Sequence, residues 1–474
     1  MTNKIVIEPV TRIEGHGKVT IYLNEKGNVD KARLHVTQVR GFEKFCEGRL
    51  FWEMPLITAR ICGICPVSHH LASAKAGDVI IGVKLTPTAE MLRRLIHMAQ
   101  IVQSHALHFF HLASPDLVFG AEADPAKRNI MGLIAEKPEL AKKGIKLRAF
   151  GQKIIETLGD KRVHPNAATP GGMTKALGYD KRDEILSQVD DIIADCRFAV
   201  DLIKDYCVQH SEEATSFANF STGYLGLVDN SGNVEYYDGK LRLKDSRGII
   251  LEDNVAPENY LSVIEEKVED WSYLKFPYYK KLGYPGGIYR VGPLGRLNVA
   301  DGCDTPLANK EFRSFKKLGS NGIVQGSLYY HYARLIEALN AAERIKSLLQ
   351  DAQICSKEIW VNSSQINEEG IGVIEAPRGT LIHHYWVDTS GKIRKVNLIV
   401  ATGNNNLAMN RAVYEVAREF VKDGKVTEGI LNRIEVAIRC YDPCLSCSTH
   451  ALGQMPLEIS IYDSDGNIYH RLRT

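Results

Sequence analysis

"RICGICPVSHH" at residues 60–70 and "DPCLSCSTH" at residues 442–450 are two stretches of the same kind near opposite ends of the chain. Each contains a pair of cysteines separated by two residues. This spacing lets both sulfurs face one metal ion from a single turn, so each pair can form half of a metal site. One site built from both pairs would tie the two ends of a large fold together.

The spacing does not decide which metal such a site holds. Four cysteines also bind structural zinc, but zinc ribbons usually place their pairs about 15 to 20 residues apart. Here 378 residues lie between Cys65 and Cys444, which a small folding module does not need. All-thiolate coordination selects soft metals, including iron and nickel, and geometry decides among them. A structural zinc site therefore remains an alternative.

Polar residues flank both pairs. Asp442 precedes the second pair and His450 follows it, while His69 follows the first pair. Side chains of this kind can donate hydrogen bonds to thiolate sulfur and tune its basicity. We therefore include Asp442 and His69 among the candidate catalytic residues.

The composition is that of an ordinary globular protein. The 474 residues are 44% hydrophobic and 24% charged, with a formal net charge of +2, which gives no indication of nucleic acid or an anionic membrane surface. The N-terminus lacks a signal peptide and no apolar run reaches about 18 residues, so we expect a cytoplasmic protein without a membrane span. In that compartment the paired cysteines favour metal or redox chemistry over disulfides.

The hydrophobic pattern predicts an α+β fold that is predominantly α. Apolar residues at helical spacing predict long helices that pack as a central bundle over 89–112, 183–219 and 329–354. Alternating patterns predict small antiparallel sheets at 4–37 and in a β-rich insertion at about 221–253.

The sequence shows no linker that would divide the chain into separate units. We expect one domain over residues 1–450 and a C-terminal extension over 451–474. The extension alternates apolar and polar residues, which predicts a β-hairpin.

The two cysteine stretches match the R-x-C-G-x-C-x-x-x-H and D-P-C-x-x-C-x-x-H signatures of nickel-iron hydrogenase large subunits. The chain resembles this family, and within it most closely the methanogen methyl-viologen-reducing (deazaflavin-non-reducing) type. The resemblance implies the fold of that family. Further stretches that carry it are "EPVTRIEGH" (8–16), "RGFE" (40–43), "HFFHL" (108–112), "HPNAATPGGM" (164–173), "YRVGPLGRLNVAD" (289–301) and "EAPRGTLIHHY" (375–385).

The resemblance implies a nickel-iron centre that carries carbon monoxide and two cyanide ligands. Its nickel would be held by Cys62, Cys65, Cys444 and Cys447, with Cys65 and Cys447 bridging to the iron. Cys444 would be the first proton acceptor when dihydrogen is split. That proton needs a relay out of a water-poor interior.

Other residues around the implied centre are identified in the same way. Glu14 in "TRIEGH" matches the family's proton-relay glutamate, and His69 would hydrogen-bond the sulfur of Cys65. Pocket residues facing the diatomic ligands and the open coordination position would be Arg378, Thr402, Pro377 and Ala401.

The resemblance also implies a second metal site that holds Mg²⁺ or Fe²⁺. Its ligands would be Glu43, the backbone carbonyl of Leu398 and the ring of His450; a carboxylate and a carbonyl suit magnesium, and an imidazole suits iron. The family usually has proline where this chain has Ala401. In most relatives a protease removes the segment after the histidine that matches His450. We expect residues 451–474 to pack on the surface while His450 reaches this site.

Electrons would have to leave through a partner, because the six other cysteines have no close Cys-x-x-Cys spacing among themselves. The resemblance implies an iron-sulfur small subunit of hydrogenase, a 2Fe-2S adaptor (delta) subunit, plus a heterodisulfide reductase complex in which a flavin bifurcates electrons toward ferredoxin. A deazaflavin- or NAD(P)-reducing hydrogenase remains an alternative. The non-catalytic quinone-site subunit of respiratory complex I would lack the four cysteines.

Overall fold

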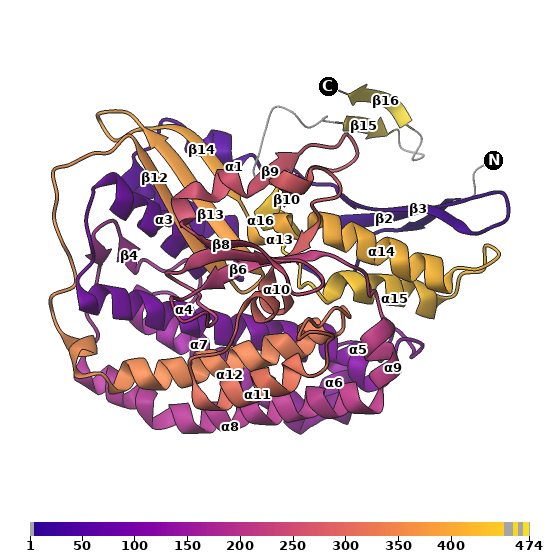
Figure 1. Cartoon of the computed structure of the whole chain (residues 1–474), viewed down its shortest axis with the longest axis horizontal. Helices are drawn as coiled ribbons and strands as arrows, with labels where there is room; N and C mark the ends of the chain where they lie inside the picture. The colour runs from indigo at the N-terminus through magenta and orange to yellow at the C-terminus, as the bar shows by residue number, and fades with distance from the viewer. Residues whose placement is uncertain (1–3, 450–457, 463–467, 474) are drawn as a thin grey trace.

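The computed structural model describes residues 4–449, 458–462 and 468–473 of the chain. A layer of long helices lies on one side of several small sheets, and on the other side the N-terminal strands lie beside the last long helices of the chain (Figure 1). The long helices are α4 (Pro87–Leu107), α7 (Pro138–Gly159), α8 (Tyr179–Gln209) and α12 (Tyr329–Gln350). This helical core with small antiparallel sheets confirms the predicted α+β class.

Two of the predicted helices are interrupted near their C-terminal ends. After α4 the chain continues as a π-helix, η3 (His108–Ala113), and then as α5 (Ser114–Phe119). After α8 the backbone leaves the helical region at His210, and a separate short helix, α9 (Ser211–Ser216), follows. Single π turns inside helices are frequent at functional sites. His105 at the end of α4 and His108 in η3 are buried in the core, where His105 contacts Glu337 at 3.0 Å, whereas His111 is only partly buried.

The N-terminal sheet and the β-rich insertion are confirmed. The first sheet has the order β1-β2-β3 and the insertion has the order β11-β6-β7-β8. The sequence pattern did not predict a third sheet, β12-β13-β14, which packs against the helix that follows the first cysteine pair. The strands are β1 (Lys4–Ile7), β2 (Gly17–Leu23), β3 (Val29–Val36), β6 (Gly223–Val228), β7 (Lys240–Lys244), β8 (Ile250–Val255), β11 (Tyr289–Arg290), β12 (Glu369–Ala376), β13 (Gly379–Val387) and β14 (Ile393–Ile399).

Short elements connect these layers. The paired strands are β4 (Ala168–Thr169) with β5 (Gly172–Met173) and β9 (Ile264–Lys267) with β10 (Phe276–Tyr279). The shorter helices are α1 (Phe42–Cys46), α2 (Met54–Thr58), α6 (Ile130–Glu136), α10 (Gly292–Val299), α11 (Pro306–Lys316) and α13 (Ala401–Asn404); the 3-10 turns are η1 (Phe51–Glu53), η2 (Ala59–Ile61), η4 (Pro257–Ser262), η5 (Lys280–Leu282) and η6 (Ala352–Cys355).

Helix α3 (Pro66–Ile80) is buried along almost its whole length, between the long helices and strand β12. Two glycines of β12 permit this contact, because a Cβ atom at Gly370 would collide with the carbonyl of Ala76 and one at Gly372 with the carbonyl of Ala72. Only glycine allows two backbones to approach so closely. The approach places the N-terminus of α3, where the first cysteine pair lies, beside the β12–β13 hairpin.

The C-terminal helices close the fold against the N-terminal sheet. Helix α14 (Asn406–Phe420) packs on β3, and α15 (Glu428–Arg439) packs on α14. The chain then turns through Asp442, which has a positive φ of 52°, into the short helix α16 (Leu445–Ser448). Strands β15 (Glu458–Tyr462) and β16 (Ile468–Arg473) pair as an antiparallel hairpin where one was expected. His450 and the linkers around this hairpin lie outside the described residues.

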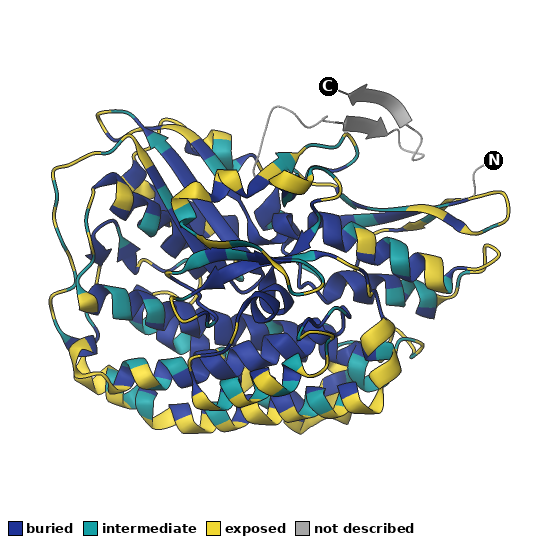
Figure 2. Ribbon diagram, in the orientation of Figure 1, coloured by how far each residue is buried: buried dark blue, intermediate teal, exposed yellow. Residues whose placement is uncertain are grey.

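The buried residues concentrate in the sheets and on the inner faces of the helices, and the outer faces of α7 and α8 are exposed (Figure 2). Within the described part of the chain, even the longest helices lack the apolar length that a bilayer crossing needs.

We predict that Gly372→Ala lowers the stability of the protein, because the added methyl group would force α3 away from β12. Overpacking of this kind costs about 1–3 kcal/mol of unfolding free energy. The measurement is the midpoint of urea unfolding. Gly178→Ala is the matched control, since an added Cβ there meets nothing within 4 Å. Equal midpoints for both variants would contradict the packing argument.

Candidate metal centre

The two cysteine pairs meet in the interior of the fold. Their four sulfurs all lie within 4.8 Å of one another, and all four residues are buried. Cys62 Sγ is 3.5 Å from Cys444 Sγ, and Cys65 Sγ is 3.9 Å from Cys447 Sγ. No other set of three or more candidate ligands gathers in the described residues. We call Cys62, Cys65, Cys444 and Cys447 the cysteine quartet.

Each pair lies at the start of a helix. Cys65 is the residue before α3, which begins with Pro66, and Cys444 is the residue before α16. Proline is favoured at the first helical position because its missing N–H would have no partner there. The positive end of the α3 dipole stabilises negative charge on the nearby sulfurs. Backbone N–H groups of Ile64 and Cys65 also donate to Cys62 Sγ, at 3.2 and 3.3 Å.

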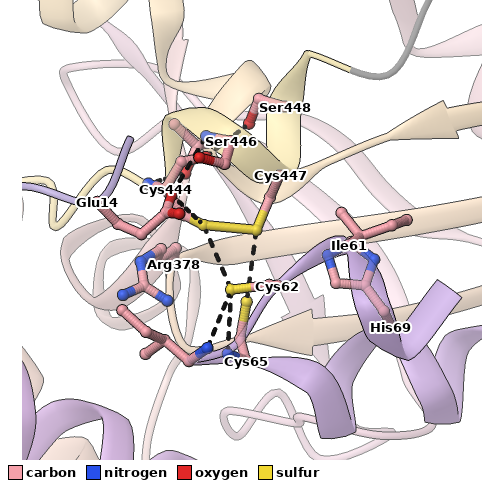
Figure 3. The surroundings of a disulfide bond; sticks show 12 residues. Glu14, Ile61, Cys62, Cys65, His69, Arg378, Cys444, Ser446, Cys447 and Ser448 are labelled. Atoms are coloured by element: carbon pink, nitrogen blue, oxygen red, sulfur yellow. Dashed lines mark hydrogen bonds between the residues drawn. A yellow bond between two sulfur atoms is a disulfide. The ribbon is translucent and has the colours of Figure 1, made fainter. Parts of the chain in front are cut away.

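Cys444 and Cys447 are joined as a disulfide in the structure, directly beside Cys62 and Cys65 (Figure 3). This pair must be reduced before it can bind a metal, because thiolates are the ligand form. The other two cysteines share a proton: the Cys65 thiol donates to Cys62 and lowers its pKa, while the same hydrogen bond and burial raise the pKa of Cys65. The quartet is therefore chemically suited to a soft metal that can replace these protons.

Glu14 reaches the quartet from the N-terminal loop. Its Oε2 lies 3.0 Å from Cys444 Sγ, so the thiol form of Cys444 can donate to it, and the backbone N–H of Ser446 donates to the same oxygen at 3.2 Å. The N–H of Leu445 donates to the Glu14 carbonyl at 3.0 Å. The next residue, Gly15, has φ +87°, and a Cβ there would approach Ser446 N to 2.8 Å. The two backbone N–H contacts and the close approach at Gly15 hold the Glu14 carboxylate against α16.

A buried cluster of charges holds the loop that carries Glu14. Arg12 donates to Asp116 and to the carbonyl of Leu112, and Thr11 donates twice to Glu435. Arg439, at the end of α15, donates to both Asp116 and Glu435. Sequence reasoning missed this cluster, because its members come from three distant segments. The cluster joins the Glu14 loop to the helix that precedes the second cysteine pair.

Arg378 lies in the turn between β12 and β13 and points toward the quartet (Figure 3). Its Nε donates to the carbonyl of Asp442 at 2.5 Å and its Nη2 to Asp442 Oδ1 at 3.1 Å. Burial lowers the pKa of Arg378, but the negative charges of Asp442 and of the nearby cysteines and Glu14 together outweigh it, so the pKa lies above its ordinary value. Burial raises the pKa of Asp442 in spite of this partner.

Two buried atoms of this ion pair have no partner among the described residues: Arg378 Nη1 and Asp442 Oδ2. Buried polar groups are nearly always hydrogen-bonded, so such atoms indicate space for a ligand or water. The four sulfur ligands suit a soft metal group, and the two unpartnered atoms suit small polar ligands carried by that group. The residues present therefore fit the implied nickel-iron centre.

The other predicted pocket residues gather around the same place. Thr402 Oγ1 accepts a hydrogen bond from the N–H of Cys444 at 2.9 Å, which ties α13 to the second cysteine pair. Pro377 is buried beside Arg378, and its carbonyl accepts from Arg296 at 3.2 Å. Ala401 is buried at the start of α13. Thr402 thus contacts the second cysteine pair directly, while Pro377 and Ala401 are the buried sequence neighbours of Arg378 and Thr402.

His69 lies beside the quartet on α3 (Figure 3). Its Nδ1 is 3.1 Å from His383 Nε2. His383 Nδ1 is in turn 2.6 Å from the hydroxyl of Tyr385. Sequence reasoning did not single out His383 or Tyr385. The signal was present in "LIHHY" (381–385), where period-two alternation in a strand places both residues on one face.

Two of the three predicted ligands of the second metal site meet. Glu43 Oε1 accepts a hydrogen bond from the N–H of Leu398 at 2.8 Å, so the carboxylate and this strand residue are neighbours. His450 lies outside the described residues. The contact is made by the N–H of Leu398, whereas the predicted ligand is its carbonyl; a carboxylate and a carbonyl would suit a hard cation such as Mg²⁺.

Comparison with protein families gives two matches. Residues 40–139 and 226–450 match the model described as nickel-dependent hydrogenase. Residues 4–39 match a model described as HoxL-like.

Curated relatives align along nearly the whole chain. The beta subunit of the NAD-reducing hydrogenase HoxS of Cupriavidus necator is 45% identical, with 99% of each chain covered. One subunit of the F420-non-reducing hydrogenase vhc of Methanococcus voltae is also 45% identical, with 98% of each chain covered. Among solved structures, a crystal structure of an NAD⁺-reducing nickel-iron hydrogenase in the H₂-reduced state superposes with a TM-score of 0.92 at 48% identity, covering 95% of this chain and all of that one.

We predict that Cys62→Ser lowers the amount of transition metal bound per chain, because serine is a poor ligand for soft metals. Elemental analysis of the purified protein measures this. Cys303→Ser is the control, since Cys303 is buried, free and not part of the quartet. The assignment would be wrong if Cys62→Ser retained the full metal content, or if both variants lost it equally.

Proposed function

The chain belongs to the nickel-dependent hydrogenase family, and from this premise we propose that it is the large subunit in which dihydrogen is split into protons and electrons. One observation carries the proposal: four buried sulfurs lie within 4.8 Å of one another, and a carboxylate lies 3.0 Å from one of them. A structural zinc site has no need of that carboxylate. The family match and these contacts together favour the hydrogenase over a zinc protein.

The quartet would hold a nickel-iron centre, with Cys65 and Cys447 shared between the metals and Cys62 and Cys444 on nickel alone. When bound, this group supplies an electrophile for one half of dihydrogen and a redox-active site for the electrons. We propose that its iron carries carbon monoxide and cyanide. Arg378 Nη1 supports that assignment, because it is a buried donor with no partner among the described residues.

The proton follows a path defined by side chains of this chain. The sulfur of Cys444 would take the proton from dihydrogen and pass it to Glu14 Oε2, which is already within hydrogen-bond distance. Glu14 is only partly buried, so its carboxyl can reach solvent or a further acceptor. The Ser446 N–H keeps the carboxylate oriented toward the sulfur.

We propose further that Glu43, the Leu398 carbonyl and His450 bind Mg²⁺ or Fe²⁺. The proximity of Glu43 to Leu398 supports two of these ligands. Because β14 carries Leu398 and pairs with β13, a cation there would brace the strand that follows Arg378. Division of the chain into a domain over 1–450 and an extension over 451–474 is part of the same proposal.

Electrons would leave through an iron-sulfur small subunit. Gly63, between the first two cysteines of the quartet, is exposed. Four large apolar side chains are exposed in the segment before it, and these are Phe45, Leu50, Trp52 and Leu56. Exposed apolar groups of this kind mark interaction sites. The segment next to the metal centre is therefore our candidate contact for that subunit.

We propose two candidate electron acceptors. The first is a 2Fe-2S adaptor (delta) subunit together with a heterodisulfide reductase complex and flavin-based bifurcation toward ferredoxin, as the resemblance implies; the similarity to F420-non-reducing hydrogenases supports that subtype. The TM-score of 0.92 to an NAD⁺-reducing enzyme favours a nicotinamide acceptor as the second candidate. We propose a cytoplasmic location for the enzyme, because four thiolate ligands require the reduced cysteines that a reducing compartment maintains.

We predict infrared bands from metal-bound carbon monoxide and cyanide in the purified enzyme, together with hydrogen-dependent reduction of a viologen dye. An infrared spectrum without these bands, together with zinc found by elemental analysis, would rule out the proposed centre. The subunits that copurify with the chain separate the two acceptors. A heterodisulfide reductase supports the first, and a nicotinamide-binding flavoprotein supports the second.

We predict that Glu14→Gln slows hydrogen–deuterium exchange between dihydrogen and water by roughly 100-fold, because an amide cannot relay the proton. The infrared bands should stay, since Gln keeps the shape of the side chain and the metal centre assembles. Mass spectrometry of the exchanged gas measures the rate. Glu8→Gln, in the same loop but paired with Lys18 on the surface, is the control and should exchange at the wild-type rate.

A further inference from the structure

A chain of three polar rings runs from the quartet into the sheet. His69 on α3 contacts His383 on β13, and His383 contacts Tyr385 two residues further along the same strand. All three side chains are buried or nearly so. Neither His383 nor Tyr385 has a part in the proton path through Cys444 and Glu14.

The glycines of β12 leave space for these three rings, which we call the ring chain. Gly372 pairs with His383 across the two strands, and Gly370 pairs with Tyr385. Directly opposite residues on antiparallel strands place their side chains on the same face. Because the two glycines contribute no side chain to that face, α3 can lie against it while the two rings extend toward α3. The same glycines that position the first cysteine pair therefore also leave space for the rings of His383 and Tyr385.

Each hydrogen bond between these rings has a preferred donor and a preferred acceptor. The contact between Tyr385 and His383 is 2.6 Å, which is the length of a strong O–H···N bond. A phenol is the stronger donor of the two and an imidazole nitrogen the stronger acceptor. Burial raises the pKa of Tyr385 well above its ordinary value, so the phenol keeps its hydrogen. Tyr385 thus donates to His383 Nδ1.

A neutral imidazole carries one N–H, so an accepting Nδ1 places the hydrogen of His383 on Nε2. That N–H faces His69 Nδ1 at 3.1 Å and donates to it. By the same reasoning His69 carries its own hydrogen on Nε2. Metal-binding sites commonly fix ring tautomers through such outer hydrogen bonds.

We propose that Tyr385 and His383 are positioning residues that hold His69 in the Nε2–H tautomer, so that its ring acts as a hydrogen-bond donor toward the cysteine quartet. A donor at this place withdraws electron density from thiolate sulfur and so tunes the metal that the quartet binds. The effect on the metal rests on the proposed function. The tautomer does not, and it can be measured in the metal-free protein.

The neighbouring residue on β13 offers a matched control. His384 faces the opposite side of the sheet, where its Nδ1 lies 2.9 Å from the hydroxyl of Tyr260. Tyr260 and His384 are as deeply buried as Tyr385 and His383. Tyr260→Phe therefore removes the same kind of hydrogen bond from the same strand without touching the ring chain.

The first experiment is two-bond proton–nitrogen NMR on the full-length, metal-free protein with nitrogen-15 in its histidines. We expect His69 and His383 as single Nε2–H tautomers in the wild type and as mixtures in Tyr385→Phe. In His383→Leu, His69 should lose its fixed tautomer, whereas His383→Gln should restore it, because the amide N–H₂ can donate in place of Nε2–H. Tyr260→Phe should change His384 alone.

The second experiment uses the metal-loaded enzyme. Tyr385→Phe should shift the carbon monoxide and cyanide infrared bands and lower hydrogen-dependent dye reduction by roughly 10-fold, as changes behind metal ligands do. Tyr260→Phe should leave the bands in place.

The proposal is overturned if His69 stays a single Nε2–H tautomer in both Tyr385→Phe and His383→Leu, or if it is an Nδ1–H tautomer in the wild type. If a tyrosine variant does not fold, the comparison of His383→Gln with His383→Leu decides alone. A wild-type protein without infrared bands but with the expected tautomers would instead refute the proposed function and leave this inference standing.

Discussion

Helix α3 lies directly on strand β12, and the rest of the site depends on how close that contact is. Gly370 and Gly372 leave no side chain between the two backbones. The N-terminus of α3 then brings Cys62 and Cys65 next to the β12–β13 turn, which carries Arg378. Half of the metal centre is thus one compact unit, made from a buried helix and a hairpin. Larger residues at either glycine would separate its two parts.

The second half is held by buried charge. Asp116 and Glu435 accept hydrogen bonds from Arg12, Thr11 and Arg439, which connects the N-terminal loop with the end of α15. Leaving one member of such a buried cluster without its partner costs about 3–5 kcal/mol. That cost opposes alternative arrangements of both segments. Glu14 and Cys444 consequently meet at hydrogen-bond distance, although 430 positions separate them in the sequence.

The polar groups around the quartet are held in fixed positions by hydrogen bonds. Arg378, Asp442, Thr402 and the Ser446 N–H each have a hydrogen-bond partner that limits their movement. Fixed dipoles in a site with little water interact strongly with developing charge and need little reorganisation. In the proposed reaction, the two protons of dihydrogen would leave toward Glu14 and its two electrons toward the exposed segment around Gly63.

The sequence by itself predicted the α+β class, and it singled out the four cysteines and Glu14 that the structure brings together, because cysteine spacing, hydrophobic periodicity and family motifs are local properties. It did not determine the β12-β13-β14 sheet, since β13 is buried on both faces and its sequence therefore does not alternate between apolar and polar residues. Only the tertiary structure paired Gly372 with His383 and Gly370 with Tyr385. Those pairings, and the charge cluster of Arg12, arise from contacts between distant segments, and no local pattern encodes which distant residue will be the partner.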